Sequence, residues 1–336
     1  MYRTLGVCGG NGVILHPFKG HLIANIEPRS KFHTGYEYQW RLNFDVPLYR
    51  ELQSRKRIGE VDVIVGAPDC GHSSVLSYSR KKSLSNPKEN ESLQIYIKSI
   101  HKYKPKIFSL ENLPAFLQNY GEDDLRRTFS NYRLVFHCCS VSRFGNSQVS
   151  RKRLLIIGVR VDLGRKILKK FKLPREGRYE LKTSGELLRG LIYPNEKLCH
   201  VRENLDQVIT LYAGKKLGLT HIKRVWTTAL QFSKRWKVVD GNFSNAPGVY
   251  KNLAHEYPLT ARPANRQFNH MGEMMSAREL GRIQGIPDSF NLWYDKGKSQ
   301  YCINKARVTV AKSTPYEIGI WLYKRINKIY KQQLIK

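Results

Sequence analysis

Short β-rich runs recur through residues 1–160, and this recurrence restricts the fold more than any other feature of the sequence. The runs are Leu22–Ile26, Val61–Val65, Ile107–Leu110 and Leu154–Val159. Each is followed by a turn or loop rich in Gly, Pro, Ser or Asn, so the region reads as strands that alternate with helices. This alternation predicts an α/β fold of the Rossmann-like type, with a mostly parallel sheet and a site built from loops at the carboxyl ends of its strands.

The strand pattern weakens between about Lys172 and Arg262, which indicates a separate, smaller domain. Basic and aromatic residues gather there, among them Lys223, Arg224, Trp226, Lys234, Arg235, Trp236 and Lys237. We therefore predict that residues 1–171 form the first part of the α/β domain, residues 172–262 the smaller domain, and residues 263–336 a segment that returns to the α/β domain. That segment ends in a basic amphipathic helix, roughly Tyr316 to Leu334, with Ile318, Leu322, Ile326, Ile329 and Tyr330 on one face.

The charge balance of the 336 residues is strongly basic, with 58 Lys and Arg against 27 Asp and Glu and a formal net charge of +31. A folded chain with this much self-repulsion usually binds a polyanion, most often nucleic acid. General solubility and binding to an anionic membrane surface are the alternatives. No apolar run approaches the ~20 residues that span a bilayer, and the N-terminus lacks a signal-peptide pattern. We expect a cytoplasmic protein, nucleoid-associated or in the host cytoplasm if a virus encodes it.

Six cysteines are present: Cys8, Cys70, Cys138, Cys139, Cys199 and Cys302. No Cys-x-x-Cys pair occurs and no His stands at zinc-ligand spacing from a cysteine pair, so we expect no zinc site. Scattered cysteines in a cytosolic chain are expected to be free thiols, and most are expected to be small buried hydrophobic residues. The remaining question is whether one of them is a nucleophile.

Three groups of polar residues stand at the ends of successive predicted strands. Cys70 lies on a loop shaped by Gly and Pro just after Val61–Val65, where a thiol can have a lowered pKa and act as a nucleophile. Glu111 follows the next strand, and Arg151 and Arg153 precede the one after it. Taken singly, these residues fit a buried structural Cys, a helix-capping partner and a solvated strand start. Their common position at strand ends favours a site.

These residues form motifs that resemble those of the cytosine-C5 DNA methyltransferase family, and the resemblance covers nearly the whole chain. The nucleophile motif matches Gly66, Pro68, Cys70 and Ser74; the Glu-Asn-Val motif matches Glu111, Asn112 and Leu113; and the Arg-x-Arg motif matches Arg151 and Arg153. A late motif is similar to Arg278, Glu279, Arg282, Gln284, Gly285, Pro287, Asp288 and Phe290. This last match is the longest and the most specific.

The resemblance implies S-adenosylmethionine as the cofactor, held by the N-terminal part of the chain. The glycines of the turn Gly9–Gly12 would let the backbone pass close to the ligand, and Glu27 at the end of the second strand would hold the ribose hydroxyls. Asp45 resembles the acid that accepts from the adenine amino group, and Pro68 would border the cofactor. Val7 stands where the family usually has Phe, and Val310 alone matches the Gly-Asn-x-Val motif that completes the pocket.

The resemblance also implies the chemistry. Cys70 would add to carbon 6 of a flipped cytosine, while Glu111 would hold the ring nitrogen and the exocyclic amine. Arg153 would bind the base carbonyl and steady Glu111, with Arg151 supporting it or contacting phosphate. The stretch Ser77–Lys88 would close over the base. Residues 172–262 would recognise the target, the partner would be double-stranded DNA without a membrane, and the protein would be a monomer.

Two alternatives stay open in the sequence. Some members of the family modify transfer RNA, so an RNA cytosine-5 methyltransferase is one alternative; the basic middle segment favours DNA. The other is a catalytically impaired DNA-binding relative, against which the retention of Cys70, Glu111 and Arg153 argues. One departure is Asp69, where the family has a second Pro. We expect Asp69 to cap a helical turn rather than to face the thiol.

Overall fold

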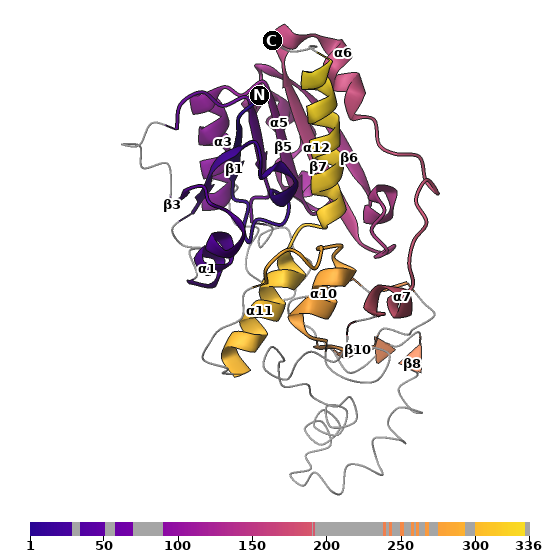
Figure 1. Ribbon diagram of the computed structural model, residues 1–336. Helices are drawn as coiled ribbons and strands as arrows, with labels where there is room; N and C mark the ends of the chain where they lie inside the picture. The colour runs from indigo at the N-terminus through magenta and orange to yellow at the C-terminus, as the bar shows by residue number, and fades with distance from the viewer. Residues whose placement is uncertain are drawn as a thin grey trace, which may run out of the picture. The chain divides into compact units, whose positions relative to one another are not determined.

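The computed structural model of the chain (Figure 1) describes residues 1–28, 34–50, 58–69, 90–189, 191, 238–239, 242–243, 249–251, 257–258, 260–261, 266–268, 275–292 and 300–332. The chain divides into two compact units. Unit 1 comprises Met1–Gly145, Arg151–Tyr179 and Ser313–Lys336, and unit 2 comprises Asn146–Ser150 and Glu180–Lys312. Each unit is described here by itself.

Unit 1 is built on a seven-stranded sheet with the order β3-β2-β1-β4-β5-β7-β6. The strands are β1 (Thr4–Val7), β2 (Leu22–Glu27), β3 (Leu48–Arg50), β4 (Val63–Gly66), β5 (Ile107–Asn112), β6 (Tyr132–Ser140) and β7 (Lys152–Arg160). The first five pair in parallel, whereas β7 runs antiparallel to both β5 and β6. The four predicted runs form β2, β4, β5 and β7, and the predicted mostly parallel α/β fold is confirmed.

The helical elements of unit 1 connect these strands. They are η1 (His16–Phe18), α1 (Thr34–Asn43), α3 (Glu91–Tyr103), α4 (Phe116–Tyr120), α5 (Glu122–Thr128), η4 (Val141–Phe144), η5 (Val161–Leu163), α6 (Arg165–Leu168), η6 (Lys169–Phe171) and α12 (Tyr316–Lys331). The predicted C-terminal helix is therefore α12. It begins at Tyr316 as expected, with Pro315 as its N-cap residue, and ends at Lys331. Among the described residues, no helix is both long enough and apolar enough to cross a membrane.

Helices α3 and α12 cover opposite faces of the sheet (Figure 1). Successive residues of a strand point to opposite faces. In β6, Phe136 packs against the core cluster that includes Tyr96 of α3, whereas the next residue, His137, has its ring centroid 6.5 Å from that of Trp321 in α12. The apolar face predicted for α12 is buried at Ile318, Leu322, Ile326 and Ile329.

Unit 2 contains a small four-stranded sheet and three helices among its described residues. The strands, in the order β11-β10-β9-β8, are β8 (Val238–Val239), β9 (Asn242–Phe243), β10 (Val249–Lys251) and β11 (Arg266–Phe268). The helices are α7 (Ser184–Leu188), α10 (Ala277–Ile283) and α11 (Gln300–Lys312). The basic and aromatic residues that we noted from Lys223 to Lys237 lie outside the described residues.

The division into units differs from the predicted boundaries of 172 and 262. Residues 172–179 stay with unit 1, and residues 263–312 belong to unit 2 instead of returning to the α/β domain. Gln148 gives one physical reason for this division. It lies on the short loop Asn146–Ser150, which belongs to unit 2. Its buried side chain donates to the carbonyl oxygen of Ile283 (3.0 Å) and to Oε1 of Gln284 (3.2 Å), and it accepts from the backbone N–H of Ala261 (2.8 Å). These bonds tie α10 to unit 2.

Candidate active site

A glycine-rich turn follows β1 and carries three residues with positive φ, which are Cys8 (57°), Gly10 (60°) and Gly12 (85°). The end of β2 lies beside this turn. Glu27 accepts hydrogen bonds at Oε1 from the backbone N–H of Gly10 (2.6 Å) and from Nδ2 of Asn25 (2.9 Å). Asn25 in turn accepts from the N–H of Gly9 (3.4 Å). Asn25 thus fastens the turn to β2, a role that the sequence motifs did not reveal.

The turn and Glu27 fit the nucleoside part of S-adenosylmethionine. Burial raises the pKa of Glu27 to about 7, although the hydrogen bonds from Asn25 and Gly10 lower it. Its Oε2 accepts no hydrogen bond from the described residues, so one carboxylate oxygen is left for a hydroxyl donor. A Cβ added at Gly10 would meet nothing within 4 Å. The backbone of the turn is therefore open at the point where a ligand would pass.

Val7 and Asp45, also expected at the cofactor, have different surroundings: Val7 ends β1 directly before the turn, and Asp45 follows Phe44, whose ring lies against Gly12. The side chain of Val7 is fully buried in the core cluster of unit 1, so it offers no surface for stacking. The side chain of Asp45 is 92% exposed, and the charged group beside it is Lys19 at 3.7 Å. Pro68 is buried on the loop after β4, and its place beside the cofactor stays a prediction.

The loop that leads to Cys70 is fixed by two asparagines, whereas Cys70 itself and residues 71–89, with the expected closing stretch Ser77–Lys88, lie outside the described residues. Nδ2 of Asn112, at the end of β5, donates to the carbonyl oxygen of Pro68 (3.1 Å). Nδ2 of Asn90 donates to the carbonyl oxygen of Asp69 (3.2 Å), and its Oδ1 caps α3 by accepting from Leu93. The backbone is thus held up to the residue before Cys70. Asn90 was not among the residues predicted from the sequence, although an Asn directly before an amphipathic helix is a signal from which the cap could have been predicted.

The cysteines of unit 1 near this loop are poor nucleophiles. Cys8 is buried, and burial together with the nearby Glu27 raises the pKa of its thiol well above the ordinary value. Burial likewise raises the pKa of Cys139 to about 11. Both thiols therefore stay protonated at neutral pH. Cys138 is free and exposed on β6.

Glu111 and Arg153 are brought together by the pairing of β5 with β7. Glu111 lies opposite Leu155, and Arg153 stands two residues before Leu155, so both side chains share one face of the sheet. Nε of Arg153 lies 2.9 Å from Oε1 of Glu111 in a largely buried ion pair. Thr314 donates from Oγ1 to the second oxygen, Oε2, at 3.0 Å. Burial raises the pKa of Glu111, whereas Arg153, Thr314 and Arg151 each lower it.

Arg151 is buried and supports the ion pair of Glu111 and Arg153 through Ser313, the neighbour of Thr314. It is 1% exposed and donates from Nη2 to the carbonyl oxygen of Ser313 (2.9 Å), which favours the supporting role over the alternative of a contact with phosphate. Asn11, in the glycine-rich turn, donates to Oγ of Ser313 (2.6 Å). Ser313 and Thr314 thus connect the turn, Arg151 and Glu111. Val310, the residue we had matched to the closing motif, belongs to unit 2, where its carbonyl oxygen accepts from Gln284 (3.4 Å).

The comparison with known proteins agrees with this geometry. The family model of C-5 cytosine-specific DNA methylases matches residues 6–317. The chain belongs to this family. The predicted family and the predicted enzyme class, a DNA (cytosine-5)-methyltransferase, are thereby confirmed. The type II methyltransferase M.FnuDI of Fusobacterium nucleatum is 23% identical over 326 residues, which cover 91% of this chain and 88% of that protein.

Solved structures show the same fold at low sequence identity. A structure described as a DNA modification methyltransferase encoded within an E. coli prophage has a TM-score of 0.66 at 14% identity, covering 98% of this chain and 100% of that one. The Dnmt2 methyltransferase of S. pombe has a TM-score of 0.59 at 11% identity, covering 99% of each chain. The methyltransferase EhMeth of Entamoeba histolytica has a TM-score of 0.61 at 12% identity and covers 100% of this chain and 99% of that one.

The late motif of this methylase has a structural role within unit 2. Arg282 and Asp288 form a two-point ion pair, with Nε–Oδ1 at 3.1 Å and Nη2–Oδ2 at 2.6 Å. Arg278 donates to the carbonyl oxygens of Pro287 (3.2 Å) and Phe290 (2.8 Å). Ser276 and Glu279 cap α10 reciprocally in a capping box. These contacts hold the turn after α10 in place, so the residues of this motif stabilise a local feature of unit 2.

Proposed function

We propose that the protein transfers a methyl group from S-adenosylmethionine to carbon 5 of a cytosine in double-stranded DNA, through a covalent adduct with Cys70. One observation carries this proposal. The buried Glu111, held by Arg153 and Thr314, stands at the end of β5, and the next residue, Asn112, fastens the backbone of the loop that presents Cys70. This arrangement supports a proposal in which Cys70 would be the nucleophile and Glu111 the proton-holding carboxyl group, on loops that follow neighbouring strands.

The thiolate of Cys70 overcomes the low reactivity of carbon 5. It forms a bond to carbon 6 of the cytosine, and the electron pair of the 5,6 double bond moves toward carbon 5, which can then bond to a methyl group. S-adenosylmethionine, when bound, supplies that methyl group from its sulfonium centre. A water molecule or basic group then takes the proton from carbon 5. The electrons of that bond restore the double bond and expel Cys70 as thiolate.

Glu111 would hold the proton that the ring needs while Cys70 adds. Its raised pKa favours the protonated carboxyl, which can donate to ring nitrogen 3 and take the proton back on elimination. Arg153 would steady the carboxyl group and bind the base carbonyl, since its guanidinium already lies 2.9 Å from Oε1. Arg151 would act through Ser313 as a positioning residue.

The cytosine must leave the base stack to reach these groups. The net charge of +31 suits a phosphate backbone, and the residues of unit 2, with the basic stretch 223–237, would recognise the target sequence. The stretch Ser77–Lys88 would close over the flipped base. The expected monomer, the cytoplasmic location and the absence of membrane association stay part of this proposal.

Matched DNA and RNA substrates test the proposed substrate class. We expect methyl label from S-adenosylmethionine on duplex DNA, and bisulfite sequencing should place it on cytosines of one short sequence. The RNA of the same sequence should stay unlabelled. Label on RNA alone would establish the RNA alternative, and cofactor binding without label on either substrate would establish the impaired relative.

Cofactor affinity is expected to rise with pH through the titration of Glu27. Ionised Glu27 accepts hydroxyl hydrogen bonds more strongly than the neutral acid does, and its pKa is raised to about 7. If the ionised form alone binds, the affinity rises about tenfold between pH 6 and pH 8. Calorimetric titration of S-adenosylmethionine measures this rise. Glu27→Gln should bind weakly with a flat pH profile, whereas an unchanged slope in that variant would place the titrating group elsewhere.

A further inference from the structure

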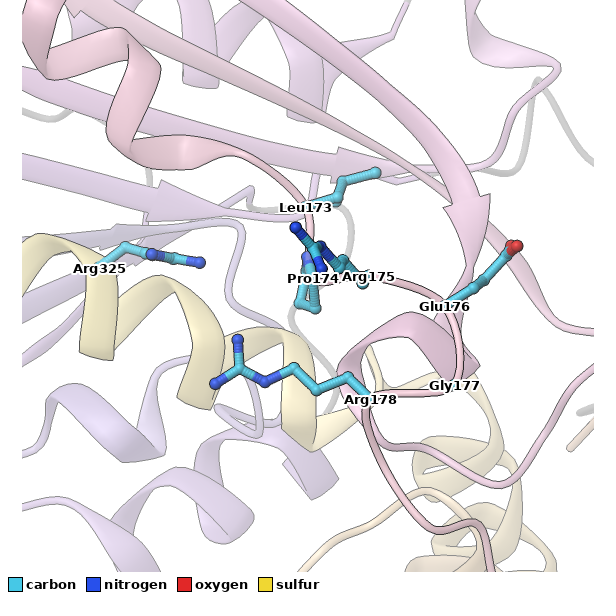
Figure 2. Close-up of a pocket in the computed structure, with 7 residues that line it drawn as sticks. All are labelled: Leu173, Pro174, Arg175, Glu176, Gly177, Arg178 and Arg325. Atoms are coloured by element: carbon cyan, nitrogen blue, oxygen red, sulfur yellow. The ribbon is translucent and has the colours of Figure 1, made fainter.

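Unit 1 contains a pocket of about 440 Å³ that none of the family motifs touches. It lies where the chain leaves η6 and passes α12, and Figure 2 shows its lining residues, which are Leu173, Pro174, Arg175, Glu176, Gly177, Arg178 and Arg325. Three of them are arginines. The side chain of Arg325 extends from α12 toward Pro174, and that of Arg178 extends from the loop toward α12, whereas Glu176 points away from them (Figure 2).

The backbone that forms the pocket is fastened on two sides. Nε of Arg143, in η4, donates to the carbonyl oxygen of Pro174 (3.2 Å). Nη2 of Arg325, in α12, donates to the carbonyl oxygen of Lys172 (3.4 Å). Pro174 itself is buried. The loop is therefore held between η4 and α12, and the pocket is a fixed feature of unit 1.

The arginines of the pocket lack acidic partners within the described part of the chain. The side chains of Arg175 and Arg178 make no hydrogen bond or ion pair there, and Arg178 lies over the ring of Tyr179 at 5.7 Å. Arg325 donates one N–H to a carbonyl oxygen and forms no ion pair with any residue that the structure describes. Clustered guanidinium groups repel one another unless an anion joins them, and their planar donor fork matches phosphate oxygens.

A short series of contacts links the pocket to the ends of β6 and β7 beside Arg153. Helix η4, which holds Pro174 through Arg143, begins directly after β6. The last residue of β6, Ser140, pairs with Lys152, the neighbour of Arg153. We infer that Arg175, Arg178 and Arg325 bind a backbone phosphate of the DNA substrate, at a site separate from the flipped base. This inference rests on the proposed function and adds a phosphate contact to it.

The salt dependence of DNA affinity tests the inference. The double variant Arg175→Gln/Arg178→Gln removes two exposed charges, and Lys98→Gln/Lys102→Gln removes two exposed charges from α3 on the opposite face of the sheet. We expect the pocket variant to lower duplex affinity about five- to tenfold and to reduce the slope of log K against log salt by about 1 per lost phosphate contact. The α3 variant should keep the wild-type slope. Arg325→Gln should act in the same direction as the pocket variant.

The remaining outcomes separate this inference from the proposed function. The maximal rate of methyl transfer at saturating DNA should be unchanged in the pocket variant, because its residues touch no reacting group. Equal slopes for the pocket variant and wild type, with methyl transfer intact, would overturn the phosphate contact alone. Loss of wild-type methyl transfer to DNA would instead remove the proposed function. Calorimetric binding of inorganic phosphate to the wild-type pocket, with an unaltered DNA slope in the variant, would identify a free-phosphate site and also overturn the inference.

Discussion

Cys70→Ala is expected to slow methyl transfer by on the order of 10⁴-fold or more, because carbon 5 of cytosine is unreactive until a thiolate has added at carbon 6. DNA binding should persist. The hydrogen bonds from Asn112 to Pro68 and from Asn90 to Asp69 fix the loop through its backbone, and the substitution changes neither of them. Filter binding and a single-turnover methylation assay measure the two quantities separately.

A trapping experiment distinguishes the covalent step from simple binding. DNA with 5-fluorocytosine at the target should stay attached to the wild-type protein in the presence of S-adenosylmethionine, because fluorine cannot leave carbon 5 as a proton does. Cys70→Ala should form no adduct. Cys138→Ala is the matched control, since Cys138 is a free and exposed thiol of unit 1 and its loss should leave trapping intact. An adduct that survives Cys70→Ala would assign the nucleophile to another residue.

Glu111→Gln is expected to lower the rate of the chemical step by about 10²- to 10⁴-fold, the usual contribution of a positioned general acid. Gln has nearly the shape of Glu and can still accept from Thr314, so the fold should be preserved. It carries no acidic proton, and it leaves Arg153 without its ion-pair partner. Single-turnover rates at saturating DNA and cofactor measure the effect.

The pH dependence of the methyl-transfer rate tests the role of Glu111 more specifically. The pKa of Glu111 is raised by burial, so the protonated carboxyl persists to higher pH than usual, and the wild-type rate should fall on the alkaline side as that proton is lost. Glu111→Gln should show no such alkaline fall. Glu122→Gln, on the exposed side of α5, is the control and should behave as wild type. A rate for Glu111→Gln within about twofold of wild type would contradict the proposed role.

Strand positions and motif residues were predictable because their signals are local. A run of β-branched and aliphatic residues followed by Gly or Pro identifies a strand end without knowledge of its neighbours. In parallel sheets the carboxyl ends of strands share one edge, so the proximity of Glu111 to the loop before Cys70 followed from chain order. The apolar face of α12 was equally visible, because its period of 3.6 residues is a property of the segment alone.

Contacts between distant segments were not predictable. Thr314 and Glu111 are 203 positions apart in the sequence, and Asn11 and Ser313 are 302 apart. At such separations no spacing of residue types indicates which residue the side chain will contact. Asn90 and Asn112 share this property, since a polar side chain that binds a backbone carbonyl leaves no pattern in the sequence. Val7 and Asp45 show how the surroundings of a motif residue depend on the fold. Both match positions of the cofactor motifs, and the structure buries Val7 in the core and leaves the side chain of Asp45 almost fully exposed.

The family and the α/β fold were thus predictable from the residues alone, and so was the proposal for the reacting groups, because each rests on residue types at short spacing. The contacts that hold Glu111 and Arg153, and the division into units, depend on packing between distant segments and became visible only in the folded chain. Helix α11 belongs to unit 2 because its contacts lie within that unit, and no local pattern in residues 300–312 shows this. The same holds for the arginines of the pocket. Arg175 and Arg325 lie far apart in the chain, and it is the packing of α12 beside the loop after η6 that brings their charges together.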